Sequence, residues 1–185
     1  MALNRYQRLA QRWARHEYSA ARRAVALPLL GLLFVVALPA LIVFAAAALD
    51  AWFHLPRLVF APVNIAVAAV AIAAGGFVAL WAIKAQFDLG RGTPAPMMPT
   101  QRLVVRPPFS YCRNPMSLGT IVLYLGIAIW TGSLSALGLV VLFTAPLMVY
   151  NRFIEERELA ERFGDDYIAY REDTPFLIPR LRGRG

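Results

Sequence analysis

The chain of 185 residues is about one domain long, but 59% of its residues are hydrophobic and only 16% are charged, which excludes an ordinary soluble domain and indicates a membrane protein. The basic residues behind its net charge of +8 flank uncharged stretches, so anionic lipids are the expected partners and nucleic acid is not. The one cysteine, Cys112, forms no internal disulfide, so nothing indicates an oxidising compartment.

The first 26 residues combine an apolar face with a basic one. On a helical wheel Leu3, Tyr6, Leu9 and Trp13 lie near one another, whereas most of the six arginines lie elsewhere. This pattern is typical of a helix in the membrane interface, and a solvated basic tail is the alternative. The segment is too long and too rich in arginine to begin a cleavable signal, so we expect the following apolar stretch to be retained as an anchor.

Two uncharged stretches follow within residues 27–83, namely 27–49 and 58–83. Each is long enough to cross a hydrocarbon core of about 30 Å at ~1.5 Å per residue. Pro39 is expected to bend the first. The Gly75-Gly76 pair in the second would allow another helix to approach closely, although glycine is common in membrane helices.

Residues 84–117 differ from both spans because they carry five basic residues and six prolines. Proline at this density excludes a continuous helix and stiffens the chain, so we expect an ordered loop that folds over another part of the molecule. By the positive-inside rule, this loop and the arginine-rich N-terminus both lie in the cytoplasm, as two crossings between them require.

The next uncharged stretch, residues 114–151, fits either one very long helix or two short ones with a turn at Thr131-Gly132-Ser133. Seven arginines follow it, and the positive-inside rule places them in the cytoplasm together with the preceding loop. The number of crossings is then even, so we predict a helical hairpin over 118–150. The hairpin brings the two ends of the stretch together, whereas a single helix would hold them roughly 57 Å apart at ~1.5 Å per residue.

Residues 151–185 hold eight of the eleven acidic residues and form the expected cytoplasmic C-terminal segment. Gly164 should separate two short helices, with Asp165 as the cap of the second. The predicted fold is therefore an all-α polytopic membrane bundle with about four transmembrane helices, an interfacial N-terminal helix, and both termini in the cytoplasm.

Polar groups gather at the two ends of the predicted hairpin. Arg113 and Asn114 precede it, and Arg152, Glu155 and Glu156 follow it. Such groups are costly to desolvate at the edge of a membrane bundle unless they are paired, so their convergence indicates a ligand site. Three tyrosines are placed to stack on a base or face a cation: Tyr111, Tyr167 and Tyr170. The alternative is that the arginines are membrane anchors and the glutamates a solvated helical turn.

The chain reads Arg-Asn-Pro-Met-Ser-Leu-Gly at 113–119, Glu-Glu-x-x-Leu at 155–159 and Phe-Gly-x-x-Tyr-x-x-Tyr at 163–170. These three motifs, in this order, resemble those of the isoprenylcysteine carboxyl methyltransferase superfamily of integral membrane methyltransferases. The superfamily pattern has Arg-His-Pro-x-Tyr-x-Gly at the first motif. At the second and third motifs it has the same residues as this chain. The resemblance covers roughly residues 85–180.

The resemblance implies a cytoplasm-facing pocket for S-adenosylmethionine and a lipophilic acceptor that enters laterally from the bilayer. The methyl group would be transferred by direct displacement in a site that excludes water. The cofactor-binding residues it implies, with the tyrosines nearby, are Tyr111, Arg113, Asn114, Pro115, Leu118, Gly119, Glu155, Glu156, Tyr167 and Tyr170. Glu156 and Arg152 are the expected catalytic residues, and no metal site is expected, since His16 and His54 lie far apart.

Two positions depart from the superfamily pattern. Asn114 replaces a histidine and cannot transfer a proton near neutral pH, and Ser117 replaces the usual tyrosine. The Asn-Pro-Met version, with Tyr124-Leu125-Gly126 downstream, is similar to phosphatidylethanolamine N-methyltransferases of the same superfamily. An ammonium acceptor must first lose a proton, for which Glu155, Glu156 or solvent is available.

The expected function is an integral membrane methyltransferase, isoprenylcysteine carboxyl methyltransferase-like, of the bacterial inner membrane. The alternatives are a phospholipid N-methyltransferase, a nicotinamide-dependent reductase of similar architecture, and a non-catalytic lipid-binding protein on the same fold. Cys112 is expected to be a packing residue and not a nucleophile, because no histidine neighbours it in the sequence.

Overall fold

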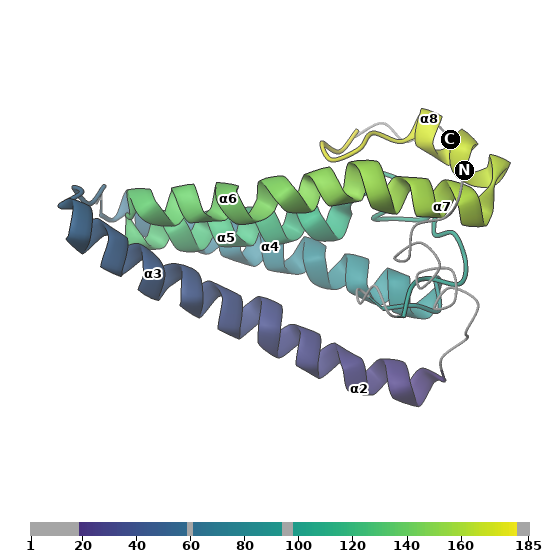
Figure 1. The fold of residues 1–185 in the computed structure, drawn as a ribbon, viewed down its shortest axis with the longest axis horizontal. Coiled ribbons are helices and arrows are strands. Elements are labelled where there is room, and N and C mark those ends of the chain that lie inside the picture. Colours follow the sequence, from purple (N-terminus) through teal and green to yellow (C-terminus); the bar gives the residue numbers. More distant parts are fainter. Residues whose placement is uncertain (1–18, 59–60, 94–97, 181–185) are drawn as a thin grey trace, which may run out of the picture.

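Residues 19–58, 61–93 and 98–180 are described by the structure, a computed structural model of the chain. Over these residues the fold is all-helical and contains no strand, as predicted. The helices, with two π-helical turns denoted η (Figure 1), are α2 Ala20–Gly31, η1 Leu32–Ala37, α3 Leu38–Phe53, α4 Val63–Asp88, α5 Pro115–Thr131, α6 Leu134–Tyr150, η2 Asn151–Glu155, α7 Glu156–Phe163 and α8 Asp165–Asp173.

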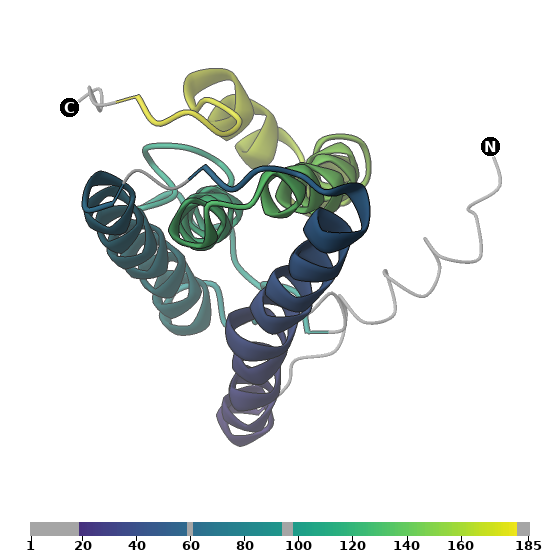
Figure 2. The same ribbon diagram turned by 90° about the vertical axis from the view of Figure 1, so that its left-hand side faces the viewer.

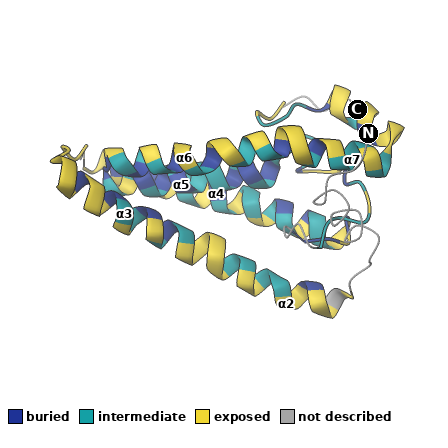
Figure 3. Ribbon diagram, viewed as in Figure 1, coloured by how far each residue is buried: buried dark blue, intermediate teal, exposed yellow. Residues whose placement is uncertain are grey.

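Three continuous helices in the described part of the chain are long and apolar enough to cross a membrane: Ala21–Phe53, Val63–Asp88 and Leu134–Phe163. The fourth, α5, is equally apolar but has only 17 residues. Much of the surface of these helices is exposed (Figure 3), and it carries large apolar side chains such as Phe44, Phe77 and Leu142. Surface of this kind is stable in lipid and not in water, so the protein is an integral membrane helix bundle.

The first helix begins at Ala20 and runs through η1 to Phe53, so it extends beyond the predicted span at both ends. The predicted interfacial helix lies mostly in residues 1–18, outside the described residues. Pro39 lies just after the π turn. In the π pattern the Phe34 carbonyl would accept a hydrogen bond from the backbone N–H of residue 39, but proline has no N–H. The Tyr124 hydroxyl donates to this carbonyl instead, at 2.6 Å, and so ties the first helix to α5.

Helices α4 and α5 form the most extensive contact in the bundle. A Cβ atom on Gly75 would lie 2.6 Å from the Gly119 carbonyl oxygen, and one on Gly119 would lie 2.5 Å from the Ala79 backbone nitrogen. Only glycine permits this approach of two backbones. The prediction of close packing is therefore confirmed for Gly75, whereas at Gly76 a Cβ would make only an ordinary contact with Leu123.

The predicted hairpin is formed by α5 and α6, with a turn at Gly132 in the left-handed region (φ 62°). The Ser133 hydroxyl caps α6 by accepting from the Ala136 N–H at 3.0 Å. Asp50, near the end of α3, accepts from the Ser135 N–H at 3.2 Å and so fixes the hairpin turn to the first helix. Viewed end-on, α4 and the α2–α3 helix flank this hairpin on opposite sides (Figure 2).

Candidate functional site

The site is built where α6 passes into α7 through the π turn η2. In this wider turn the Glu156 N–H bonds to the Asn151 carbonyl, five residues earlier, and π turns are often found at functional sites. Asn151 and Glu156 are buried, and both contact the residues that precede α5. The hairpin thus brings together the two polar ends of the stretch, as the sequence predicted.

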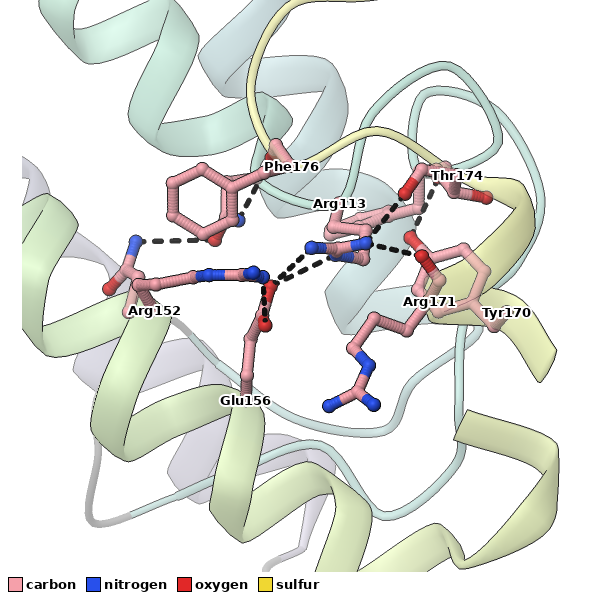
Figure 4. Close-up of polar contacts among 10 residues, drawn as sticks. Arg113, Arg152, Glu156, Tyr170, Arg171, Thr174 and Phe176 are labelled. Atoms are coloured by element: carbon pink, nitrogen blue, oxygen red, sulfur yellow. Dashed lines mark hydrogen bonds and ion pairs between the residues drawn. The ribbon is translucent and has the colours of Figure 1, made fainter. Parts of the chain in front are cut away.

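Glu156 is held between two arginines (Figure 4). One of its oxygens lies 2.7 Å from Arg113 Nη2 and 2.9 Å from Arg113 Nε, which is a two-pronged contact. Its other oxygen lies 2.7 Å from Arg152 Nη1. The Arg113 and Glu156 side chains are each 8% exposed, whereas that of Arg152 is 50% exposed. Both carboxylate oxygens of Glu156 are therefore engaged.

Arg113 also fastens the segment after α8 to the site. Its Nη1 donates to the carbonyls of Arg171 and Thr174, at 2.5 and 2.7 Å, and its backbone N–H donates to the Pro175 carbonyl at 2.9 Å. The Phe176 ring lies 5.8 Å from the Arg113 guanidinium and 5.6 Å from that of Arg152, within the range of cation–π attraction. The segment after α8 therefore covers these ion pairs.

An amide cluster lies beside the ion pairs. Asn114 donates to the Phe176 carbonyl at 3.0 Å. The Asn151 amide lies 3.2 Å from Asn114 Oδ1 and 3.0 Å from Ser117 Oγ, and its other end is 3.0 Å from a carboxylate oxygen of Glu155. The two residues that depart from the superfamily motif, Asn114 and Ser117, therefore connect to Glu155 through Asn151.

These groups border a pocket between α4, the loop before α5, the π turn η2, α7 and α8. Its volume is about 60 Å³, which suits a few water molecules and is far below the roughly 300–1,000 Å³ of pockets that enclose drug-sized ligands. Its lining residues are Gln86, Thr100, Leu103, Val104, Phe109, Arg113, Asn114, Asn151, Glu155, Glu156, Leu159, Tyr167 and Tyr170. The described part of the loop before α5, residues 98–114, forms one wall of the pocket.

Tyr167 of α8 and the nearby Cys112 are buried, and Tyr170 is partly buried. Tyr167 packs against Tyr170, and the Tyr170 hydroxyl donates to the Phe109 carbonyl at 2.7 Å. Burial raises the pKa of both phenols, and the charge of Glu156 raises that of Tyr167 further, so both remain protonated at neutral pH. Burial also raises the pKa of the Cys112 thiol, as expected for a packing residue.

Several predicted site residues lie outside the pocket lining. Tyr111 packs edge-on against Trp81, at 6.2 Å between ring centroids. Pro115 is buried in the first turn of α5, and the Gly119 Cα faces α4 at the glycine crossing. These three residues shape the site through packing. Two more predicted residues do not line the pocket either: Leu118 and Arg152.

Three residues of the site were missed by sequence reasoning. Asn151 ends the uncharged stretch 114–151, and the available signal was its spacing of four residues from Glu155, which places an amide and a carboxylate on the same face of a helix. Gln86 lines the pocket, and its buried Oε1 has no hydrogen-bond partner among the described residues. Phe176 belongs to no sequence motif that would have indicated a place in the site.

Comparison with known protein families gives one match: the family model described as phospholipid methyltransferase matches residues 63–166. Comparisons with curated proteins and with solved structures give no match. The matched region exceeds half of the chain and runs from the first turn of α4 into α8, so it includes Arg113, Asn151, Glu155 and Glu156. The chain therefore belongs to the phospholipid methyltransferase family, within the isoprenylcysteine carboxyl methyltransferase-like superfamily.

Proposed function

We propose that the protein uses S-adenosylmethionine to methylate the amine of a phospholipid headgroup. The observation that carries this proposal is the convergence of Arg113, Asn114, Glu155 and Glu156 on one pocket at the end of the bundle. The family is one of membrane methyltransferases, and this is where the molecule combines polar groups with a cavity next to apolar helix surface.

The polar groups of the pocket suit S-adenosylmethionine, which supplies an electrophilic methyl group on a sulfonium. Gln86 Oε1 is an acceptor without a partner and is suited to an amino group of the donor. Leu103, Val104 and Leu159 offer an apolar wall for the adenine. Because the cavity measures only about 60 Å³, we expect the loop before α5 or the segment after α8 to move outward when the donor binds.

The π turn η2 suits an acceptor that comes from the bilayer. Glu155 lines the pocket, whereas the preceding Phe153 and Ile154 are exposed. A lipid whose chains lie against this apolar surface would have its headgroup within reach of the carboxylate. The arginines around the pocket favour a cytoplasmic location for this end of the bundle and for both termini, on the side where the donor is available.

The test is transfer of labelled methyl groups by the purified protein in lipid nanodiscs. We expect label in phosphatidylethanolamine and a rise in thermal stability with S-adenosylhomocysteine. A protein that shows no thermal shift or calorimetric signal with either form of the donor would contradict the donor assignment. Label in the carboxylate of a prenylated cysteine, with none in the amine lipid, would replace the proposed acceptor. Donor binding without transfer to any component of a total lipid extract would favour a non-catalytic role.

A further inference from the structure

We infer that Arg23 of α2 binds the phosphate of the phospholipid acceptor and so determines which amines reach the methyl donor. The inference rests on the proposed function, because it names how the acceptor of the same pocket is recognised. Arg23 belongs to none of the three motifs and precedes residues 63–166, which the family model matches. It is a specificity-determining residue that acts on the headgroup and not on the methyl group.

Arg23 is a buried cation without an anion beside it. The residue is 9% exposed, and it forms no ion pair within 4 Å in the part of the chain that the structure describes. Its Nη1 donates to the Phe87 carbonyl at 2.9 Å, and its guanidinium lies 4.7 Å from the centre of the Phe87 ring. A buried guanidinium is costly to hold in this state unless an anion pairs with it. An anionic ligand would supply that partner.

The nitrogen atoms of Arg23 that remain are suited to a phosphate. Its Nε is buried and has no hydrogen-bond partner among the described residues. In any arginine, Nε and Nη2 form one edge of the guanidinium, which takes two oxygens of a phosphate side by side. The Phe87 carbonyl occupies Nη1, so it does not block this edge.

The position of Arg23 fits the headgroup of a lipid. Arg23 lies in the first turn of the membrane span Ala21–Phe53, which is the depth of the headgroups. Its contact residue on α4, Phe87, directly follows Gln86, which lines the pocket. Only two carbon atoms separate the phosphate from the amine in phosphatidylethanolamine. A headgroup whose phosphate is bound at Arg23 therefore has its amine beside the wall of the pocket.

The helix that follows Arg23 offers apolar surface for the acyl chains. All six residues of η1, Leu32–Ala37, are exposed, and six consecutive residues cover the full circumference of a helix. Among the described helices, α2 has extensive contact only with η1, its own continuation, and it lies apart from α4 and α6 (Figure 1). Lipid chains in the bilayer therefore border this helix, with Arg23 at the headgroup end.

The donor also carries an anion, the carboxylate of its methionine part, but Arg23 is less suited to it. Arg23 does not line the pocket, and it approaches α4 from the helix that borders lipid. The assignment to the lipid phosphate therefore predicts that loss of Arg23 weakens binding of the acceptor and leaves binding of the donor unchanged.

The experiment measures methyl transfer in mixed micelles by wild type, Arg23→Gln and Arg23→Lys. Arg23→Gln removes the charge and keeps an N–H donor. Its KM for phosphatidylethanolamine should rise about 10–100-fold, the contribution of a hydrogen bond to a charged group, while kcat changes by less than about threefold. Arg23→Lys restores the charge without the two-pronged edge and should recover part of the loss. With a long-chain primary amine that lacks a phosphate, all three proteins should have the same KM.

Arg22→Gln is the matched control. Arg22 is the neighbouring residue, it is exposed, and its backbone N–H bonds to the Ser19 hydroxyl at 3.4 Å. This variant removes the same charge from the same turn of the helix, so it should keep the wild-type KM. An equal rise in KM for Arg22→Gln and Arg23→Gln would show general attraction to the membrane surface and would overturn the assignment.

A second readout does not depend on turnover. Native mass spectrometry should show that wild type retains phosphatidylethanolamine in preference to diacylglycerol, which has the same chains and no phosphate, and that Arg23→Gln loses this preference. Retention of inorganic phosphate in place of the phospholipid would overturn the lipid assignment. The melting temperature of Arg23→Gln without ligand verifies folding, and its thermal shift with S-adenosylhomocysteine should equal that of wild type.

Three further results decide between this inference and the proposed function. A KM for phosphatidylethanolamine that Arg23→Gln leaves unchanged would overturn the inference alone. A folded Arg23→Gln that no longer responds to S-adenosylhomocysteine would assign Arg23 to the donor and overturn the inference as well. A wild-type protein that retains the phospholipid through Arg23 but methylates no amine would support the phosphate site and contradict the proposed function.

Discussion

Replacing Arg113 by alanine tests how the site is held together. The side chain joins three parts of the molecule: the turn before α5, Glu156 of α7, and the segment after α8. Its guanidinium makes the two-pronged contact with Glu156 and donates to the carbonyls of Arg171 and Thr174. Arg152 contacts the same carboxylate through one nitrogen, and its side chain is half exposed, so Arg152→Ala is the matched control.

The two substitutions should differ several-fold in cost. Removal of one partner from a buried ion pair costs about 3–5 kcal/mol, because the other charge is left in a poorly solvated place. Because Arg152 still pairs with Glu156 in the Arg113→Ala variant, we expect a cost at the lower end of this range, about 3 kcal/mol. The carbonyls of Arg171 and Thr174 also lose their donor, which adds about 1 kcal/mol to the cost of Arg113→Ala where water does not replace the guanidinium. Arg152→Ala removes a half-exposed pair and should cost about 0–1 kcal/mol.

The measurement is the free energy of unfolding by denaturant titration in detergent micelles, followed by tryptophan fluorescence. Adding Glu156→Ala to each arginine variant completes two double-mutant cycles. We expect a coupling of about 2–3 kcal/mol for Arg113 with Glu156 and under about 1 kcal/mol for Arg152 with Glu156. Hydrogen exchange should also quicken at the Arg113-dependent segment after α8. Equal costs for the two arginine variants, or a coupling near zero for Arg113, would refute this account of the site.

Two further predictions concern packing. Gly119→Ala places a Cβ 2.5 Å from the Ala79 backbone nitrogen and should lower the free energy of unfolding by about 1–3 kcal/mol. Gly76→Ala, whose Cβ would have its nearest contact at 3.7 Å, should leave the free energy of unfolding nearly unchanged. Equal losses for the two variants in the denaturant titration would contradict the close approach of α4 and α5 at Gly119. Cys112 should react slowly with thiol reagents until the protein is denatured. Its raised folded pKa predicts a loss of stability that begins as the pH rises past the ordinary thiol pKa of 9.0. Cys112→Ala should remove this part of the loss, whereas the part that begins above the ordinary phenol pKa of 10.0, from Tyr167 and Tyr170, should remain.

Much of the fold followed from the distribution of charge along the sequence. Uncharged stretches predicted the membrane helices, and the positive-inside rule predicted that residues 114–151 fold as a hairpin, which α5 and α6 confirm. The predicted ends of the helices were less accurate. Helix α4 runs to Asp88, five residues beyond the predicted end at 83. A charged residue ends an uncharged stretch but need not end a helix, and Lys84 and Asp88 form an exposed i, i+4 pair at 2.6 Å within the added turns.

The sequence by itself determined that this protein is a membrane helix bundle and that polar residues from both ends of the hairpin meet, since these conclusions need only composition and the order of motifs. Only the tertiary structure decided which partner each polar group takes. Glu156 pairs with two arginines while Glu155 faces the pocket beside Asn151, and Phe176 covers both guanidiniums. These contacts depend on the register of the π turn and on the path of the C-terminal segment, and both are set by packing between residues far apart in the chain.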